Sequence, residues 1–336
     1  MKILLLLFFT YQITFSQTKD YTQYHLQINK AETLFFMENK VDSSLYYYDK
    51  VFSEYDFIFV KDLVNAAQIA YFSKKSYQKY IEQGFEQGLK ISHLKNYPIF
   101  KKVYSSLLKD KKLLAVFNIK RAKYISRIDF KYLDWIYKIA IADQKNKRLK
   151  TNKYNELLHK STDRLIDSVI KKGFPGDKII GINDSTIFQE INKPYLNLHM
   201  QIHKNKDLWY MTSDEQILAS HWSIVLFVHN GCSYNLYKTY FLKEMKKGNI
   251  HPREIGLLYD NMYRYKGSYP SYCEHISLNG AYKLNMFTEY ADLKNKKQTN
   301  EMRKLLYIVS TDVDDKKREF EVYHDFKLFS GFWNCR

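Results

Sequence analysis

The chain has 336 residues, of which 45% are hydrophobic and 26% are charged, and this composition excludes wholesale disorder. Only 11 glycines and 5 prolines occur, which argues against a turn-rich all-β fold and favours helices. The formal net charge is +17, but only nine of the basic residues are arginines, the side chains suited to bidentate recognition of bases and phosphates. We therefore interpret the lysine excess as a solvated surface and expect no nucleic-acid partner. An acidic polysaccharide or membrane surface stays open as an alternative partner.

The first 16 residues have the pattern of a secretory signal peptide. Lys2 supplies the positive start, residues 3–9 form an apolar centre, and small residues precede Gln17. This centre is too short to span a bilayer, which takes about 20 residues. No cysteine lies near its end, so no lipid anchor is expected. The sequence therefore predicts a periplasmic or secreted protein with no transmembrane segment after signal removal.

Residues 18–145 have the pattern of successive helical hairpins. Similar segments recur at an offset of 36 residues, where Ala31 and Ala67 each begin an apolar helical stretch that ends in a polar turn. A weaker third copy covers 103–112. Paired helices of this length stack because neither buries its apolar stripe alone. This half loosely resembles the tetratricopeptide repeat class, whose period is roughly 34 residues. That resemblance implies a concave surface for protein partners, whereas an irregular helical bundle is the alternative.

The polar stretch 143–153 is the expected boundary between two domains, 18–145 and 154–336. Beyond it, the pattern predicts a helix over 156–172 that Gly173 and Pro175 end. Residues 178–184 read as a short strand or an extended arm, and 195–203 as either helix or strand.

Three helices with clear start and stop signals follow between Ser213 and Gly267. Ser213 and Gln216 form a capping-box pattern ahead of an apolar run over 217–228, Ser233 and Gly248 bound a second helix, and Pro252 begins a third. Two more helices are expected at 300–308 and from Thr311 or Asp312 to Tyr323. The apolar tail 326–336 is expected to dock on the C-terminal domain. The fold class is therefore mainly α, with at most short strands in the C-terminal domain.

Residues 156–272 also resemble an uncharacterised bacterial domain family. The matching landmarks, in chain order, are Gly173-Phe174-Pro175, Gly181, Val228-His229, Leu258-Tyr259-Asp260, Gly267 and Tyr272. Asn261 stands where that pattern has arginine, and Cys273-Glu274-His275 replaces a Gly-Thr segment. The resemblance implies a domain boundary and candidate positions, but no reaction.

Seven of the ten histidines lie between His199 and His324, and His229 is the strongest catalytic candidate among them. If Asp260 orients its ring, His229 could act as a general base, with Tyr272 or Cys232 supplying a hydroxyl or thiol. The structural alternative, which we favour, is that His229 caps a helix end while Asp260 pairs with Arg264.

No cofactor or metal site is predicted. His199 and His203 have a zinc-like spacing, but the glutamate of a metalloprotease motif is missing, and no CxxC motif occurs. The three cysteines are Cys232, Cys273 and Cys335, and in an oxidising compartment Cys273 and Cys335 are the favoured disulfide pair, with three separate thiols as the alternative.

The sequence thus favours a non-enzymatic exported protein that binds a protein or peptide partner through its helical-repeat half. A hydrolase-like enzyme using His229 and Asp260 is the first alternative, and a lysine-rich binder of acidic polysaccharide or membrane surface is the second.

Overall fold

The computed structural model describes residues 19–148, 154–184, 186–191, 221–264, 284 and 295–328. These residues form helices joined by short turns, and no strand occurs among them, which confirms a mainly α fold. Several expected features lie outside the described residues: the signal peptide at 1–16, the capping box at Ser213, His199 and His203, and Tyr272.

The helices follow one another closely along the chain. In order they are α1 (Tyr21–Phe36), α2 (Val41–Glu54), α3 (Val60–Phe72), α4 (Gln78–Glu86), the 3-10 turns η1 (Ile91–Asn96) and η2 (Pro98–Phe100), α5 (Lys101–Leu107), α6 (Lys111–Arg127), α7 (Phe130–Arg148), α8 (Tyr154–Lys172), α9 (Asp177–Ile180), α10 (Ile187–Glu190), α13 (Trp222–His229), α14 (Ser233–Lys246), α15 (Pro252–Arg264), α16 (Lys296–Leu305) and α17 (Thr311–Tyr323).

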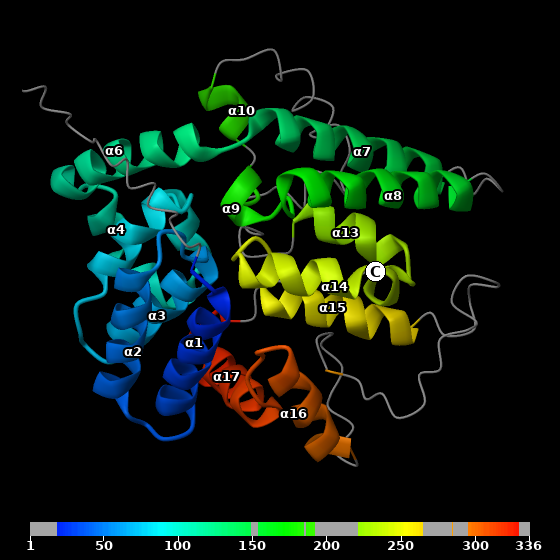
Figure 1. Ribbon diagram of the computed structural model, residues 1–336. Coiled ribbons are helices and arrows are strands. Elements are labelled where there is room, and N and C mark those ends of the chain that lie inside the picture. The colour runs from blue at the N-terminus through cyan, green and yellow to red at the C-terminus, as the bar shows by residue number, and fades with distance from the viewer. Residues whose placement is uncertain are drawn as a thin grey trace, which may run out of the picture.

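The first four helices form two packed pairs, α1 with α2 and α3 with α4 (Figure 1). Asp20 caps α1 by accepting a hydrogen bond from the Thr22 amide at 2.8 Å. The two hairpin turns contain Asn39 and Lys74, which both adopt a positive φ, near 55°. Where α1 meets α2, the Ser44 hydroxyl donates to the Ala31 carbonyl at 2.8 Å, so the small alanine lets the two backbones approach. One helix of each pair, α1 and α3, contributes residues to the candidate site described below.

The long helices α6 and α7 lead away from these pairs, and α8 runs beside α7 (Figure 1). Beneath them α13, α14 and α15 pack on one another, and α13 also contacts α7 and α8. The stop and start signals in this half act as expected. Gly173 ends α8 with a φ of +90° and Gly248 follows α14 with a φ of +75°, a region that glycine adopts without strain.

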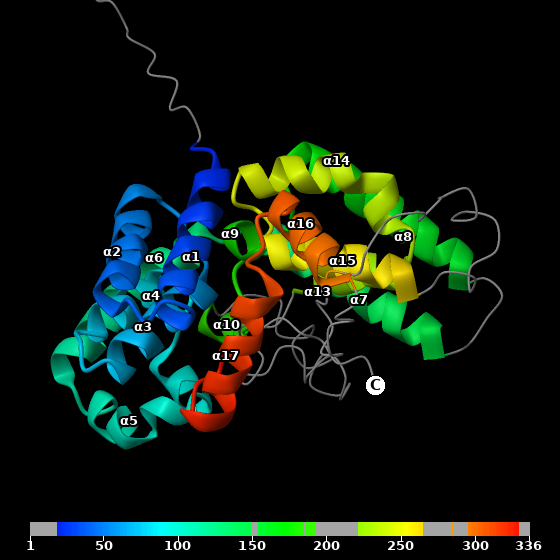
Figure 2. The ribbon, with the colours of Figure 1, turned by 90° about the horizontal axis from the view of Figure 1, so that it is seen from below.

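Helix α17 returns to pack against α1 (Figure 2). The ring of Phe320 lies 5.3 Å from that of Phe35 and 5.2 Å from that of Phe36. Buried side chains from both predicted domains belong to one continuous hydrophobic cluster. The polar stretch expected to separate the domains is partly helical, because α7 continues to Arg148.

Residues 326–328, the described part of the expected C-terminal tail, contact α17 as expected but also the N-terminal helices. They reach across to α3, where Gln68 exchanges two hydrogen bonds with the backbone of Lys327, at 2.9 and 3.1 Å. The ring of Phe326 lies near those of Phe35 and Phe72 as well as that of Phe320. Residues 326–328 therefore fill the junction between α17 and the N-terminal helices. Sequence composition showed that the tail must be buried, but not against which surface.

Two further expectations need correction. Residues 178–184 are neither strand nor extended arm throughout, because 177–180 form the short helix α9, which Gly181 ends. The cap of α17 is Ser310, one residue before the expected positions, and its hydroxyl accepts a hydrogen bond from the Val313 amide.

Gly181 gives a test of this packing. It has a φ of +79° and a ψ of 174°, and an added Cβ would lie 2.3 Å from the Tyr124 hydroxyl oxygen. We expect Gly181→Ala to lower the free energy of unfolding by about 2–5 kcal/mol, because backbone strain and overpacking add. Urea unfolding measures the change. The variant Ser126→Ala, exposed on α6, should stay within about 0.5 kcal/mol of wild type, and a similarly small effect at Gly181 would contradict the packing described.

Candidate functional site

The candidate site is a small cavity of about 30 Å³ where α1, α3, α15 and the segment from Tyr307 to α17 meet. A volume of this size holds a few atoms or one to three water molecules. Its lining is mostly polar, which is unusual so close to an aromatic core. The lining residues used below are His25, Asn29, Glu32, Lys61, Asp62, Asn65, His251, Arg253 and Lys317. We call this the polar pocket.

Helical periodicity brings the N-terminal lining residues together. His25, Asn29 and Glu32 are spaced by four and three residues on α1, and Lys61 and Asn65 by four on α3, so each set shares one face of its helix. The same faces carry the apolar residues that pack α1 and α3 into the core. The polar pocket is therefore a polar interruption of the core faces of the two hairpins.

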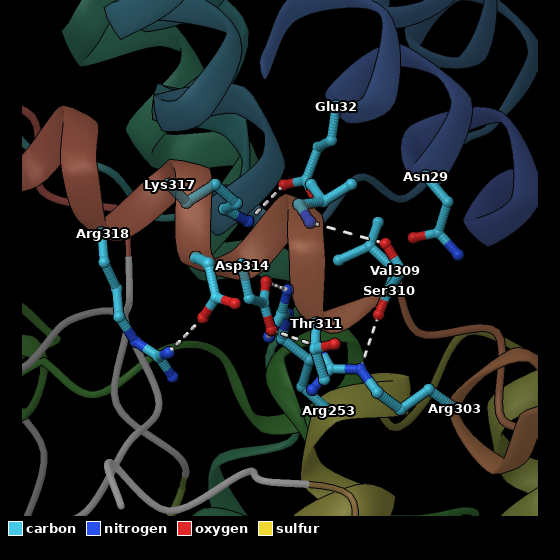
Figure 3. Close-up of polar contacts among 12 residues, drawn as sticks. Asn29, Glu32, Arg253, Arg303, Val309, Ser310, Thr311, Asp314, Lys317 and Arg318 are labelled. Carbon is cyan, nitrogen blue, oxygen red and sulfur yellow. Dashed lines mark hydrogen bonds and ion pairs between the residues drawn. The ribbon is translucent and has the colours of Figure 1, made fainter. Parts of the chain in front are cut away.

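Buried ion pairs form the side of the polar pocket contributed by the C-terminal half (Figure 3). The Lys317 ammonium lies 2.6 Å from Glu32, and both side chains are almost fully buried. Asp314 accepts two hydrogen bonds from Arg253, at 2.6 and 3.0 Å, and another from Arg303. Burial alone would raise the pKa of Asp314, but the two guanidinium groups outweigh it and hold the pKa well below its usual range.

Three polar groups in the polar pocket have no strong partner among the described residues. His25 Nε2 and Asn65 Oδ1 are buried without a hydrogen bond. The residue Lys61 is only 7% exposed, and no carboxylate of the described chain lies within ion-pair distance of its ammonium. Its contact is the ring of Phe59, whose centroid is 5.9 Å away. Buried polar groups normally find partners, so these three groups make the pocket the candidate binding site of the described residues.

The two histidines of the polar pocket are neutral at physiological pH. Burial, assisted by Lys61, lowers the pKa of His25 to about 3. Burial also lowers the pKa of His251 well below its usual value, and the charges that add to this effect are all cationic. Burial is the larger cause of both low pKa values, and the nearby cations add to it.

Asp62 is a carboxyl group of the pocket whose pKa lies close to neutral pH. It accepts a hydrogen bond from the Tyr24 hydroxyl at 2.8 Å and is 3% exposed. Burial raises the pKa of Asp62 to about 7, with Glu32 adding to the rise, while Tyr24, Lys61 and Lys317 oppose it. This carboxyl is therefore substantially protonated at and below neutral pH.

The predicted catalytic residues lie apart from the polar pocket. His229 ends α13, and its Nδ1 is 2.7 Å from Asp143 on α7. The Tyr154 hydroxyl donates to the other oxygen of Asp143 at 3.0 Å. Asp260 instead accepts a hydrogen bond from the Leu284 amide at 2.6 Å. The described carboxylate that contacts His229 is thus Asp143, which the sequence analysis placed in the polar stretch at the expected domain boundary.

The disulfide expectation was wrong in its pairing. Cys232 is disulfide-bonded, and with only three cysteines in the chain this excludes a Cys273–Cys335 bond. A bonded Cys232 has no thiol, so it cannot supply the nucleophile considered beside His229.

The described parts of the chain contain no group of three or more histidine, cysteine or carboxylate side chains placed to hold a metal ion. No described helix has both the length and the apolar character to cross a bilayer. In comparisons with known proteins, no family model, no curated protein and no solved structure matches this chain. The tetratricopeptide and uncharacterised-domain resemblances therefore remain predictions.

The sequence did not predict the pocket residues as a site. One signal was present in the sequence. His25, Glu32 and Asn65 fall at positions that continue the apolar stripes of their helices, and a polar residue there must be buried. The partners contributed by α15 and α17 carry no comparable local signal.

Asp62 makes the pocket testable through pH. Its pKa is raised by folding, so its stabilising contribution is complete below about pH 4 and is lost as pH rises through about 7. We expect Asp62→Asn to remove this loss. The free energy of unfolding of the variant, relative to that of wild type, should therefore rise by about 2 kcal/mol from pH 5 to pH 7.5. Urea unfolding at several pH values measures this difference. His25 and His251 also make stability depend on pH, in the opposite direction to Asp62, but they do so in both proteins and cancel in the comparison. Asp42→Asn, exposed on α2, should follow the wild-type profile, and a parallel profile for Asp62→Asn would refute the raised pKa.

Proposed function

We propose that this protein is a non-enzymatic binding protein that acts outside the cytoplasm and engages a protein or peptide partner at the polar pocket. The observation that carries the proposal is the coexistence of paired and unpaired polar groups in one buried place. Glu32, Lys317, Asp314 and Arg253 satisfy one another, whereas His25 Nε2 and Asn65 Oδ1 have no described partner. The unpaired groups lie on the two N-terminal helix pairs, the half expected to bind partners.

The two histidines of the pocket suit binding better than acid–base catalysis. A general base works best when its pKa lies near the operating pH. The pKa of His25 is about 3 and that of His251 is also strongly lowered, both mainly by burial, so neither imidazole takes up a proton readily at neutral pH. Both rings are therefore suited to hydrogen bonding and packing.

The pocket also has partly open walls through which a partner's group can enter. Asn29 and Tyr307 are partly exposed at its edge, and the Asn29 amide donates to the Tyr307 carbonyl at 2.8 Å. The Arg253 side chain is 18% exposed.

A hydrolase-like enzyme is the second candidate, and one observation favours it. The 2.7 Å contact between His229 and Asp143 is the arrangement in which a carboxylate orients a catalytic imidazole. The residue meant to supply the hydroxyl, Tyr272, lies outside the described residues. The dyad also has a structural role, because it joins α13 to α7.

A capture experiment tests the binding proposal. The purified protein is immobilised, and extracellular or periplasmic proteins of its native source are passed over it. We expect Asn65→Leu, which removes both polar atoms at nearly constant volume, to retain at most about a tenth of the partner that wild type retains. Asn118→Leu, the same change on the exposed face of α6, is the matched control.

Mass spectrometry identifies the retained protein, and circular dichroism melting confirms that both variants fold. Equal retention by Asn65→Leu would refute partner binding at the pocket. Turnover of an ester or peptide that disappears in His229→Ala, but persists in Asn65→Leu, would instead establish the hydrolase.

A further inference from the structure

Lys61 is the cation of the polar pocket that the described chain leaves without a counter-ion. Lys317 pairs with Glu32, and Arg253 and Arg303 share Asp314. The carboxyl groups that Lys61 influences are Asp62 and Asp177, and neither lies within ion-pair distance. A buried ammonium without a counter-ion is costly, so an anion entering the pocket would be stabilised there.

The neighbours of Lys61 can complete a hydrogen-bonding site. The neutral His25 ring lines the same cavity, and its unpartnered Nε2 is able to donate. Asn65 lies one turn after Lys61 on α3, so their Cβ atoms are about 5–6 Å apart on one face. Its Oδ1 is an unpartnered acceptor. The lining of the cavity thus includes a cation, a potential donor and an acceptor.

We infer that the polar pocket binds the C-terminal carboxylate of a peptide or protein, with Lys61 and His25 holding the carboxylate and Asn65 Oδ1 accepting the N–H of the last residue. This inference rests on the proposed function and names the group that the partner presents. A terminal carboxylate fits because the amide nitrogen of the last residue lies only two bonds from the carboxylate carbon. Backbone capture of chain ends is a known mode of peptide recognition.

Size and charge argue against other anions. About 30 Å³ admits a planar carboxylate more easily than a hydrated phosphate. Glu32 lines the same cavity, so a dianion would meet a fixed negative charge, whereas one negative charge matches the one unpaired ammonium. Asp62, when protonated, can donate a further hydrogen bond to a carboxylate.

The test compares two synthetic pentapeptide pools of mixed sequence, one ending in a free carboxylate and the other in an amide. Fluorescence polarisation with labelled pools measures binding to the full-length mature protein. We expect the free-acid pool to bind at least tenfold more tightly than the amide pool. Lys61→Met should lower free-acid binding at least tenfold, whereas Lys243→Met, exposed on α14, should leave it unchanged.

Acetate and inorganic phosphate serve as competitors at equal ionic strength. The inference requires that acetate competes only weakly and phosphate not at all beyond the chloride control. Equal binding of the acid and amide pools by wild type overturns the inference without relying on any variant. Acetate that binds as tightly as the peptide pool would assign the site to a small free carboxylate and likewise overturn it.

The outcome separates this inference from the broader proposal. If the captured partner is lost in Asn65→Leu but binds Lys61→Met and its own C-terminally amidated form normally, partner binding stands and carboxylate recognition fails. If the partner is retained equally by all variants, both fail.

Discussion

The buried carboxylate of Asp314 is the interaction on which the C-terminal half depends most. It joins three helices, because Arg253 from α15 and Arg303 from α16 both donate to it on α17. Arg303 also donates to the carbonyls of Val309 and Leu284, so its guanidinium fixes the turn before α17. Removing one member of such a cluster leaves charges buried without compensation, which costs about 3–5 kcal/mol. The cluster orients α17 so that Lys317 reaches Glu32.

A second buried ion cluster in the same protein has a partner of opposite charge for each of its charged groups. Asp184 is held by Lys90 at 2.9 Å and by Arg121 at 2.5 Å, and Arg121 also binds Glu190. Burial opposes ionisation of Asp184, but these two cations keep its pKa well below the usual range. Cations and carboxylates there are matched, and the cluster ties the short helix α10 to α6. The polar pocket lacks this balance at Lys61, which makes the pocket the better candidate for binding a partner.

Local signals in the sequence predicted most of the helices, and their limits follow from what such signals encode. Pro252 at the start of α15 and Gly173 after α8 act through their own backbone geometry, so their effects are visible without a fold. The partnership of Asp143 with His229 spans 86 residues and depends on α7 packing against α13. Asp143 sits among lysines and asparagines, and nothing in that composition shows that α7 would carry it into the interior.

The polar pocket could be inferred from sequence only in part, for a related physical reason. A histidine, a glutamate or an asparagine on an apolar helical stripe predicts burial, and burial of a polar group demands a partner. For Glu32 that partner is Lys317, 285 residues away, and for Asp62 it is Tyr24 on the neighbouring hairpin. Lys61 meets the same demand without a described counter-ion, although its charge acts on two carboxyl groups whose pKa values burial raises to about 7. Folding has therefore buried a cation that has no ion-pair partner among the described residues, and an anion from a partner would complete the pairing.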